Sequence, residues 1–176
     1  MSSVTTLSVI SGPTHANETP NEWHVSGSYS TDQLRGVRAG YRITDVDLSL
    51  LDHLTWLGSP KLHVEAAVNY WENSNDHADN IAALTVSPVL SWQLSEGRRP
   101  LFLEAGIGAS LIDDKQIGDR GLSTTFQFED RIALSWQYSV TSLARLTLGY
   151  THYSNADLDS PNDGLDFFSL TWSAPF

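Results

Sequence analysis

The sequence predicts an all-β protein, an eight-stranded antiparallel up-and-down barrel that spans a membrane. Eight segments of the 176-residue chain alternate between apolar and polar side chains, as half-buried strands do. No apolar run approaches the ~18–20 residues that a membrane helix needs. Short connections between the segments alternate with longer ones, which is typical of an up-and-down barrel.

The eight alternating segments account for most of the chain after its first two dozen residues. They are residues 23–30, 36–43, 62–71, 82–92, 101–110, 126–137, 146–154 and 165–176. Residues 72–80 and 113–123 are polar and are predicted to be exposed loops, whereas the segment 45–59 fits either a short amphipathic piece or the start of a strand. Pro88 and Asp130 interrupt two apolar faces, and we expect a β-bulge at each of them.

The N-terminal residues differ from the rest of the chain. They lack the basic region and the long apolar stretch of a secretion signal, so no intact signal peptide is expected. We expect residues 1–21 to form a polar extension and residues 22–176 to form the barrel. If the protein is exported, the sequence corresponds to the mature form behind a start Met.

The polar faces of the predicted strands combine charged residues with glycines. They carry Arg38, Arg42, Glu65, Glu104, Glu129 and Arg131 together with Gly36, Gly40, Gly106 and Gly108. The interior of an eight-stranded barrel has room for small side chains and paired charges, so these faces are expected inside, with the charges satisfied as ion pairs. The apolar faces, which are rich in Trp and Tyr near strand ends, then meet hydrocarbon.

Composition excludes several classes of partner. The formal net charge is −11 and there is no long cluster of Lys and Arg, which argues against nucleic acid as a partner. The chain has no cysteine, so neither a disulfide nor a thiolate metal site is available. His24, His53, His63 and His77 show no metal-ligand spacing, and we predict neither a metal nor a cofactor.

A candidate catalytic group lies in the last 33 residues. His152 and Ser154 share one face of a predicted strand because alternate side chains point to the same side. The turn residues 161–164 fold the last strand back against this one, which can bring Asp166 to His152. A serine, a histidine and an acid in this arrangement are what nucleophilic acyl transfer needs.

Four stretches of the sequence resemble the PagL family, the lipid A 3-O-deacylases of Gram-negative outer membranes. They are residues 102–108, 128–132, 152–156 and 161–164. The resemblance implies an eight-stranded outer-membrane barrel that hydrolyses the ester at the 3-position of lipid A. It also implies Ser154 as nucleophile, His152 as base and Asp166 as orienting acid, although the family has Glu at the last position.

The resemblance extends to the residues that follow the serine. Asn155, Ala156 and Asp157 match the oxyanion-stabilising region of the family, except that the family usually has glycine where this chain has Asp157. An acidic side chain at that position is expected to disturb an oxyanion site.

The resemblance further implies lipopolysaccharide as the substrate and the outer membrane as the location. Phe176, taken as the periplasmic end of the last strand, puts the active site towards the outer leaflet. Whether the protein is a monomer or a homodimer stays open. The alternative is a barrel without catalytic activity, either a structural outer-membrane protein or a soluble carrier of an apolar ligand.

Overall fold

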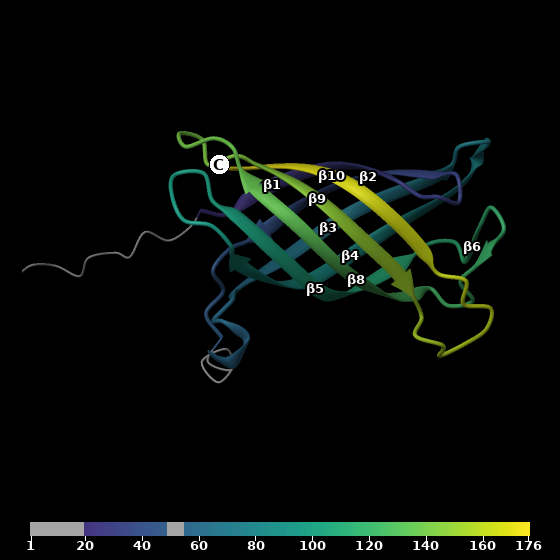
Figure 1. The fold of residues 1–176 in the computed structure, drawn as a ribbon. Helices are drawn as coiled ribbons and strands as arrows, with labels where there is room; N and C mark the ends of the chain where they lie inside the picture. Colours follow the sequence, from purple (N-terminus) through teal and green to yellow (C-terminus); the bar gives the residue numbers. More distant parts are fainter. Residues whose placement is uncertain (1–19, 49–54) are drawn as a thin grey trace, which may run out of the picture.

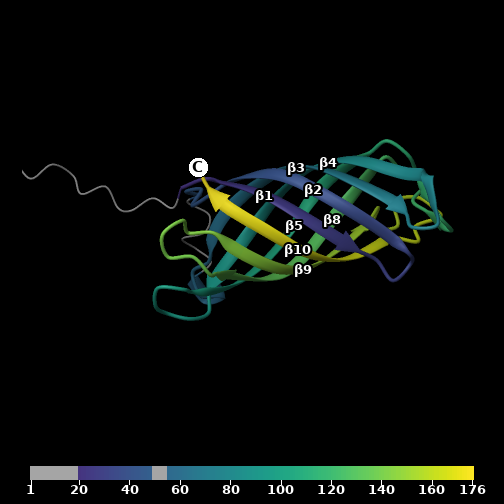
Figure 2. The same ribbon diagram turned by 90° about the horizontal axis from the view of Figure 1, so that it is seen from above.

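The computed structural model describes residues 20–48 and 55–176, which form a closed barrel of eight antiparallel strands (Figures 1 and 2). The strands are β1 (Glu22–Tyr29), β2 (Leu34–Ile43), β3 (Lys61–Asn73), β4 (Asp76–Gln93), β5 (Leu101–Ile112), β8 (Phe126–Gln137), β9 (Arg145–Ser154) and β10 (Leu165–Pro175). Each strand pairs with its neighbours in the chain, and β10 closes the barrel against β1. The predicted fold class is therefore confirmed.

Two small elements lie in the connections between barrel strands. A 3₁₀ turn, η2 (Thr55–Leu57), precedes β3, and a short hairpin of β6 (Gln116–Ile117) and β7 (Arg120–Gly121) lies between β5 and β8. No helix in the described ranges has the length and apolar character that crossing a membrane requires. The predicted N-terminal extension lies almost wholly outside the described residues, as does part of the segment 45–59 that was left unassigned.

The loop predicted at residues 72–80 is wrong, because most of it is strand. β3 continues to Asn73 and β4 begins at Asp76, so that only a two-residue turn separates them. The side chain of Asn73 donates a hydrogen bond to Asp79 across this pair. These residues are largely exposed on both faces at one end of the barrel, so their polarity reflects solvent contact rather than the absence of a strand.

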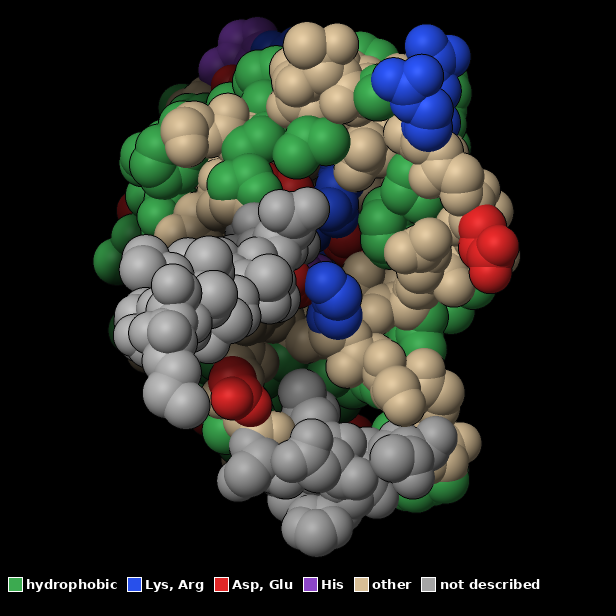
Figure 3. Space-filling view, turned by 90° about the vertical axis from the view of Figure 1, so that its left-hand side faces the viewer, with side chains coloured by type: hydrophobic (Ala, Val, Ile, Leu, Met, Phe, Trp, Pro, Cys, Tyr) green, Lys and Arg blue, Asp and Glu red, His purple; other side chains and the backbone are tan. Residues whose placement is uncertain are grey.

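The charged faces of the strands point into the barrel, as predicted. Arg42 donates two hydrogen bonds of 2.8 Å to the carboxylate of Glu104 and a third of 2.8 Å to Glu65. Arg38 forms an ion pair of 2.6 Å with Glu129. Seen along the barrel axis, acidic and basic side chains are visible in the hollow between hydrophobic side chains (Figure 3).

The apolar faces of the same strands point outward. Val37, Leu84 and Leu148 are each more than 60% exposed. They belong to a continuous band of exposed apolar side chains, which is larger than the apolar patches found on soluble monomers. Trp23 and Phe176 pack their rings 5.8 Å apart at the end where the C-terminus lies. This arrangement is that of a barrel whose outer surface faces hydrocarbon.

The interior also contains an apolar cluster near the end of the barrel opposite the C-terminus. Its members are Leu34, Trp71, Ile81, Ala83, Ile112, Ile117, Leu122, Tyr153, Leu165 and Phe167. Ile117 and Leu122 come from the connection between β5 and β8, so this connection packs its apolar side chains into the cluster. Tyr153, Leu165 and Phe167 come from β9 and β10, which ties these two strands to the interior.

Neither of the two bulges expected from the sequence is present. At Pro88 the pairing between β4 and β5 lapses for two residues on each strand, but the register is unchanged on either side. A Cβ on Gly106 would come 2.4 Å from the carbonyl oxygen of Pro88, so the two strands approach closely there. Asp130 pairs in register with Ile107 on one side and His152 on the other, and it stays on the outward face.

Replacing Glu104 by alanine should destabilise the barrel, because it removes the bidentate partner of the buried Arg42. Breaking one member of a buried ion pair typically costs about 3–5 kcal/mol, and we expect that loss in the free energy of unfolding by urea in detergent. Glu72→Ala is the matched control, since its ion pair with Arg35 lies at the surface and should contribute about 0–1 kcal/mol. Equal losses in both variants would contradict the role given to the interior ion pairs.

Candidate active site

His152 and Asp166 face each other across neighbouring strands. They are directly opposite in the register of β9 and β10, and His152 Nδ1 lies 2.8 Å from Asp166 Oδ1. Their side chains are 35% and 36% exposed, so the pair is accessible from outside the barrel. The aspartate therefore reaches the histidine directly, although it is one methylene shorter than the glutamate of the family pattern.

Tyr150 is a third member of this group that the sequence reasoning did not single out. Its hydroxyl donates a hydrogen bond of 2.6 Å to Asp166 Oδ1, the same oxygen that contacts His152. Tyr150 precedes His152 by two residues and shares its face of β9, so the alternation pattern contained the signal. Two donors on one oxygen hold the carboxylate in a single orientation.

The contact with Asp166 determines which nitrogen of His152 carries the proton. A carboxylate only accepts hydrogen bonds, so the neutral imidazole donates from Nδ1–H. Nε2 then carries the lone pair, and in the described part of the chain it has no hydrogen-bond partner. The imidazole is thus oriented as a base towards the outside of the barrel.

Gly164 makes room for the imidazole ring. Its φ angle is +65°, and a Cβ at this position would come 2.7 Å from His152 Cε1. Any side chain would therefore push the ring away from its contact with Asp166, in addition to straining the backbone. The glycine of the predicted turn is needed beside the histidine as well as for the turn itself.

Ser154 lies on the same outward face, two residues beyond His152 at the end of β9. It pairs with Phe128 of β8. Within residues 20–48 and 55–176 its hydroxyl makes no hydrogen bond, to His152 or to any other group. The structure thus joins two of the three predicted catalytic residues by a hydrogen bond and puts the third beside them; in unliganded active sites such contacts are often long and tighten only with substrate.

Asn155 is buried and holds the loop of the site in place through its hydrogen bonds. Its side-chain amide donates to the carbonyl oxygens of Leu122 and Asp159 at 3.1 and 3.0 Å, and its backbone N–H donates to Asn162 Oδ1 at 3.0 Å. The residue is fully buried. In this unliganded state the donors of Asn155 are therefore engaged within the chain, and its role as an oxyanion donor stays a prediction.

Ala156 and Asp157 form a turn with two successive positive φ angles, +53° and +58°. Their backbone N–H groups have no acceptor among the described residues. The carboxylate of Asp157 accepts a hydrogen bond of 3.0 Å from the side chain of Asn162, which holds this oxygen in the loop. Asn162, expected from the sequence to serve only the turn, therefore binds both ends of the segment 155–157.

The hairpin of β6 and β7 braces the loop between β9 and β10 (Figure 1). Asp163 exchanges two hydrogen bonds with the backbone of Gly121, at 2.7 and 3.0 Å. Arg120 donates to the carbonyl oxygen of Asp163 and forms an ion pair of 2.5 Å with Asp32. The hydrogen bond that Arg120 donates to Asp32 raises the pKa of Arg120 above its usual value, so Arg120 stays charged at any physiological pH.

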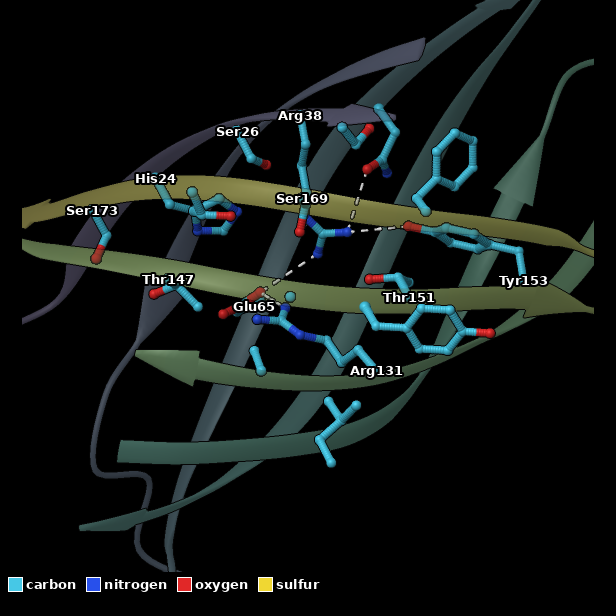
Figure 4. A pocket seen from close by; sticks show the side chains of 18 of the residues that line it. His24, Ser26, Arg38, Glu65, Arg131, Thr147, Thr151, Tyr153, Ser169 and Ser173 are labelled. Atoms are coloured by element: carbon cyan, nitrogen blue, oxygen red, sulfur yellow. Dashed lines mark hydrogen bonds and ion pairs between the residues drawn. The ribbon is translucent and has the colours of Figure 1, made fainter. Parts of the chain in front are cut away.

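A small cavity inside the barrel is distinct from this group of residues. It is a cavity of about 50 Å³ lined by polar side chains such as His24 and Ser169. Arg38 crosses it to reach Glu65 and Tyr153 (Figure 4). Most of its lining residues alternate along the strands with His152 and Asp166, so the cavity lies mainly on the inner side of the barrel wall, although Ile132 and Tyr150 of the outward face also border it.

The chain is an eight-stranded barrel with an apolar exterior, and this exterior carries a histidine–aspartate pair and a serine. These features are those of an outer-membrane-type barrel with a hydrolase-like site on its surface. The family model described as lipid A 3-O-deacylase (PagL) matches residues 35–175. The chain therefore belongs to the PagL family.

Individual relatives agree with this membership. The lipid A deacylase PagL of Pseudomonas aeruginosa is 32% identical over 111 residues, which make up 63% of this chain and 62% of the relative. The Bordetella bronchiseptica protein of the same name is 31% identical over 107 residues, 61% of this chain and 57% of the relative. The matched stretches thus span less than two thirds of either relative.

Solved structures share the fold. The crystal structure of the outer membrane enzyme PagL superposes with a TM-score of 0.71 at 24% identity, and covers 88% of this chain and 99% of that chain. A de novo designed transmembrane β-barrel has a TM-score of 0.60 at 12% identity, over 92% of this chain and 98% of the design.

The hydrogen bond from the Asn155 amide to Asn162 gives a testable expectation about the loop. A single such bond contributes about 0.5–1.5 kcal/mol, so Asn162→Ala should speed hydrogen exchange of the Asn155 amide roughly 2- to 10-fold in NMR spectra of the refolded protein. Asn75→Ala, which changes a turn asparagine elsewhere in the same half of the barrel, should leave that rate unchanged. An unaltered rate in Asn162→Ala would show that the loop is held by other contacts.

Proposed function

We propose that the protein is a serine esterase that removes the ester-linked 3-hydroxyacyl chain at the 3-position of lipid A in lipopolysaccharide. The observation that carries the proposal is the hydrogen-bonded pair of His152 and Asp166 on the outward face of the barrel, beside Ser154, in a chain of the PagL family. Two relatives carry the name lipid A deacylase.

The geometry supports a mechanism of acyl transfer. His152 Nε2 takes the proton of the Ser154 hydroxyl as the oxygen attacks the ester carbonyl, and later gives it to the departing sugar oxygen. Asp166 holds the imidazole in the Nδ1–H tautomer and stabilises the positive charge that forms on it. Water then hydrolyses the acyl-serine with His152 again acting as base, which releases the fatty acid.

The oxyanion of the tetrahedral intermediate needs donors that are not already engaged. The backbone N–H groups of Ala156 and Asp157 fit this requirement, since both are unpaired among the described residues and lie two and three residues after the nucleophile. Two successive amides in such a turn form a concave site for an anion. The hydrogen bond from Asn162 to the Asp157 carboxylate keeps the negative side chain engaged, which limits the disturbance expected from an acid at this position.

The substrate would reach the site from the side, through the membrane. The outward face that carries His152 continues into Leu148, which is 66% exposed, so acyl chains can lie against the barrel wall while the ester meets Ser154. Lipid A occupies the outer leaflet, and we propose that the end of the barrel with the β9–β10 loop faces that leaflet. The lipid need not be extracted into the barrel.

The alternative of a soluble carrier conflicts with the interior. A carrier of an apolar ligand needs an apolar cavity, whereas this barrel is filled by buried ion pairs such as that of Arg42 and Glu104. A purely structural barrel gives no reason for the outward pair of His152 and Asp166, because a partly exposed hydrogen bond of this kind contributes little to stability.

Ser154→Ala and His152→Asn should each lower deacylation by roughly a thousandfold or more, because nucleophile and base act as one unit. The measurement is mass spectrometry of lipopolysaccharide incubated with detergent-refolded protein, following loss of one 3-hydroxyacyl chain. Ser173→Ala, a change of the same kind inside the barrel, should retain activity. Retained activity in Ser154→Ala would remove the serine from the mechanism.

Asp166→Asn should lower turnover strongly, by about 10²- to 10⁴-fold, because an amide can hold the imidazole in the wrong tautomer. Since the aspartate already reaches His152 at 2.8 Å, Asp166→Glu should bring no gain. Tyr150→Phe removes only one of the two donors to the carboxylate and should have a smaller effect. Wild-type turnover in Asp166→Asn would assign the orienting role to another group.

A further inference from the structure

A pocket of about 570 Å³ lies inside the barrel at the end where the C-terminus is found. Its wall includes inward-facing residues of five strands, namely His63 of β3, Ser91 of β4, Phe102 of β5, Gln137 of β8 and Arg145 of β9. Seen from this end, basic side chains are visible in the hollow of the barrel (Figure 3). Arg145 begins β9 and Ser154 ends it, so the length of this strand separates the pocket from the proposed catalytic group.

Arg145 is the first of two donors in this pocket that lack an acceptor. It is only 5% exposed. Its Nε lies 3.5 Å from Glu22 and its Nη1 lies 3.9 Å from Glu104, but neither contact is a hydrogen bond, and Glu104 already accepts two hydrogen bonds from Arg42. Among residues 20–48 and 55–176 the third nitrogen, Nη2, has no acceptor either, and it is the edge of the guanidinium that is open to the pocket. The positive charge of Arg145 is therefore incompletely matched.

Phe102 fixes the plane of this guanidinium. The guanidinium carbon of Arg145 lies 4.6 Å from the centre of the Phe102 ring, a distance at which a cation is attracted to an aromatic face. Stacking uses the flat face of the guanidinium and leaves the N–H groups at its edge available to a ligand. Arg145 is thus held in place without its hydrogen-bond donors being used.

His63 supplies the second donor. It is 2% exposed, and its Nδ1 accepts a hydrogen bond of 3.2 Å from the backbone N–H of Asp45. Nδ1 therefore carries the lone pair, and the proton of the neutral imidazole is on Nε2. In the part of the chain that the structure describes, this Nε2–H group has no acceptor.

The two donors line the pocket from opposite sides of the barrel. β3 and β9 are four places apart in either direction around the ring of eight strands. Lys61 and Asp45, which also line the pocket, form an ion pair of 2.8 Å with each other. Water satisfies N–H groups but not charge, whereas a carboxylate or phosphate satisfies both, because a guanidinium binds these groups through charge-assisted hydrogen bonds. The pocket therefore has the donors and the charge of an anion site.

We propose that this pocket binds a small water-soluble oxyanion, a carboxylate or a phosphate, with Arg145 Nη2 as the main donor and His63 Nε2–H as the second. The anion completes the charge around Arg145, which Glu22 and Glu104 match only at a distance. With the β9–β10 loop towards the outer leaflet, as proposed above, this mouth of the barrel opens to the periplasm, and the ligand comes from there. The site takes no part in deacylation and goes beyond the proposed function.

The test is an NMR titration of the full-length protein, refolded in detergent with 15N-labelled arginine. Sodium phosphate should shift the side-chain N–H signals of Arg145 until they saturate, with a Kd of about 0.1–10 mM for so small a ligand. Sodium chloride at the same ionic strength should not. A parallel titration with sodium acetate distinguishes the two kinds of anion, since tighter binding of acetate identifies a carboxylate ligand and tighter binding of phosphate identifies a phosphate ligand.

Variants identify the donors. The signals of Arg145 are those missing from Arg145→Gln or, equally, from Arg145→Lys. His63→Phe keeps a ring but removes the Nε2–H group, and it should raise the Kd read from Arg145 by about 10- to 100-fold, as loss of a hydrogen bond to a charged group does. Arg99→Gln is the matched control, because it removes an exposed positive charge beside Pro100 of the pocket wall, and it should leave the Kd unchanged. Folding of each variant is checked by its resistance to unfolding in sodium dodecyl sulfate on a gel.

The outcomes separate a specific site from general attraction of anions. A saturable shift with either anion that is weakened in His63→Phe and unchanged in Arg99→Gln supports the inference. Three results overturn it: no saturable shift with phosphate or acetate, an equal shift with chloride, or equal weakening in Arg99→Gln and His63→Phe. Because the titration uses no lipid A, its result does not depend on the proposed deacylase function, which the activity assays test separately.

Discussion

The inward faces of β9 and β10 need apolar side chains that pack inside the barrel, whereas their outward faces carry the polar residues of the site. The position of the site depends on both conditions. Tyr153, Leu165 and Phe167 point inward and are buried in the apolar cluster. Their neighbours His152 and Asp166 must then point outward, directly opposite each other. A slip of one residue would exchange the two sets, burying the polar pair and exposing the aromatic rings. The packing of Tyr153, Leu165 and Phe167 inside the barrel thus keeps His152 and Asp166 on its outer surface.

Much of this arrangement is predictable from the sequence because it follows from a period of two. Alternation identifies all eight barrel strands and the face on which each residue lies, and glycines next to charged residues indicate the interior that holds Arg42 and Glu104. The same period puts His152 and Ser154 on one face, and the turn chemistry of residues 161–164 brings Asp166 to the histidine. These are relations within one strand or across one hairpin.

The remaining features depend on contacts between distant segments, which no local pattern reveals. Asn155 is bound by Leu122, and Asp163 by Gly121, so the loop of the site is built partly by a hairpin from another part of the chain. The polar residues 72–80 at the barrel rim were predicted to form a loop, although most of them extend β3 and β4. Asp130 looks like a defect in an apolar face until the register puts it beside His152.

The central claim is that the group of His152, Ser154 and Asp166 lies on the membrane-facing side of the barrel wall. Because the chain has no cysteine, single spin labels can be attached at Leu148 and Leu170, and at Thr147 and Ser169, in protein refolded into lipid bilayers. Labels at Leu148 and Leu170 should be accessible to oxygen dissolved in the membrane and shielded from a water-soluble relaxation agent, whereas labels at Thr147 and Ser169 should not contact lipid. The reverse pattern would mean that the apolar faces point inward, and would contradict the claim.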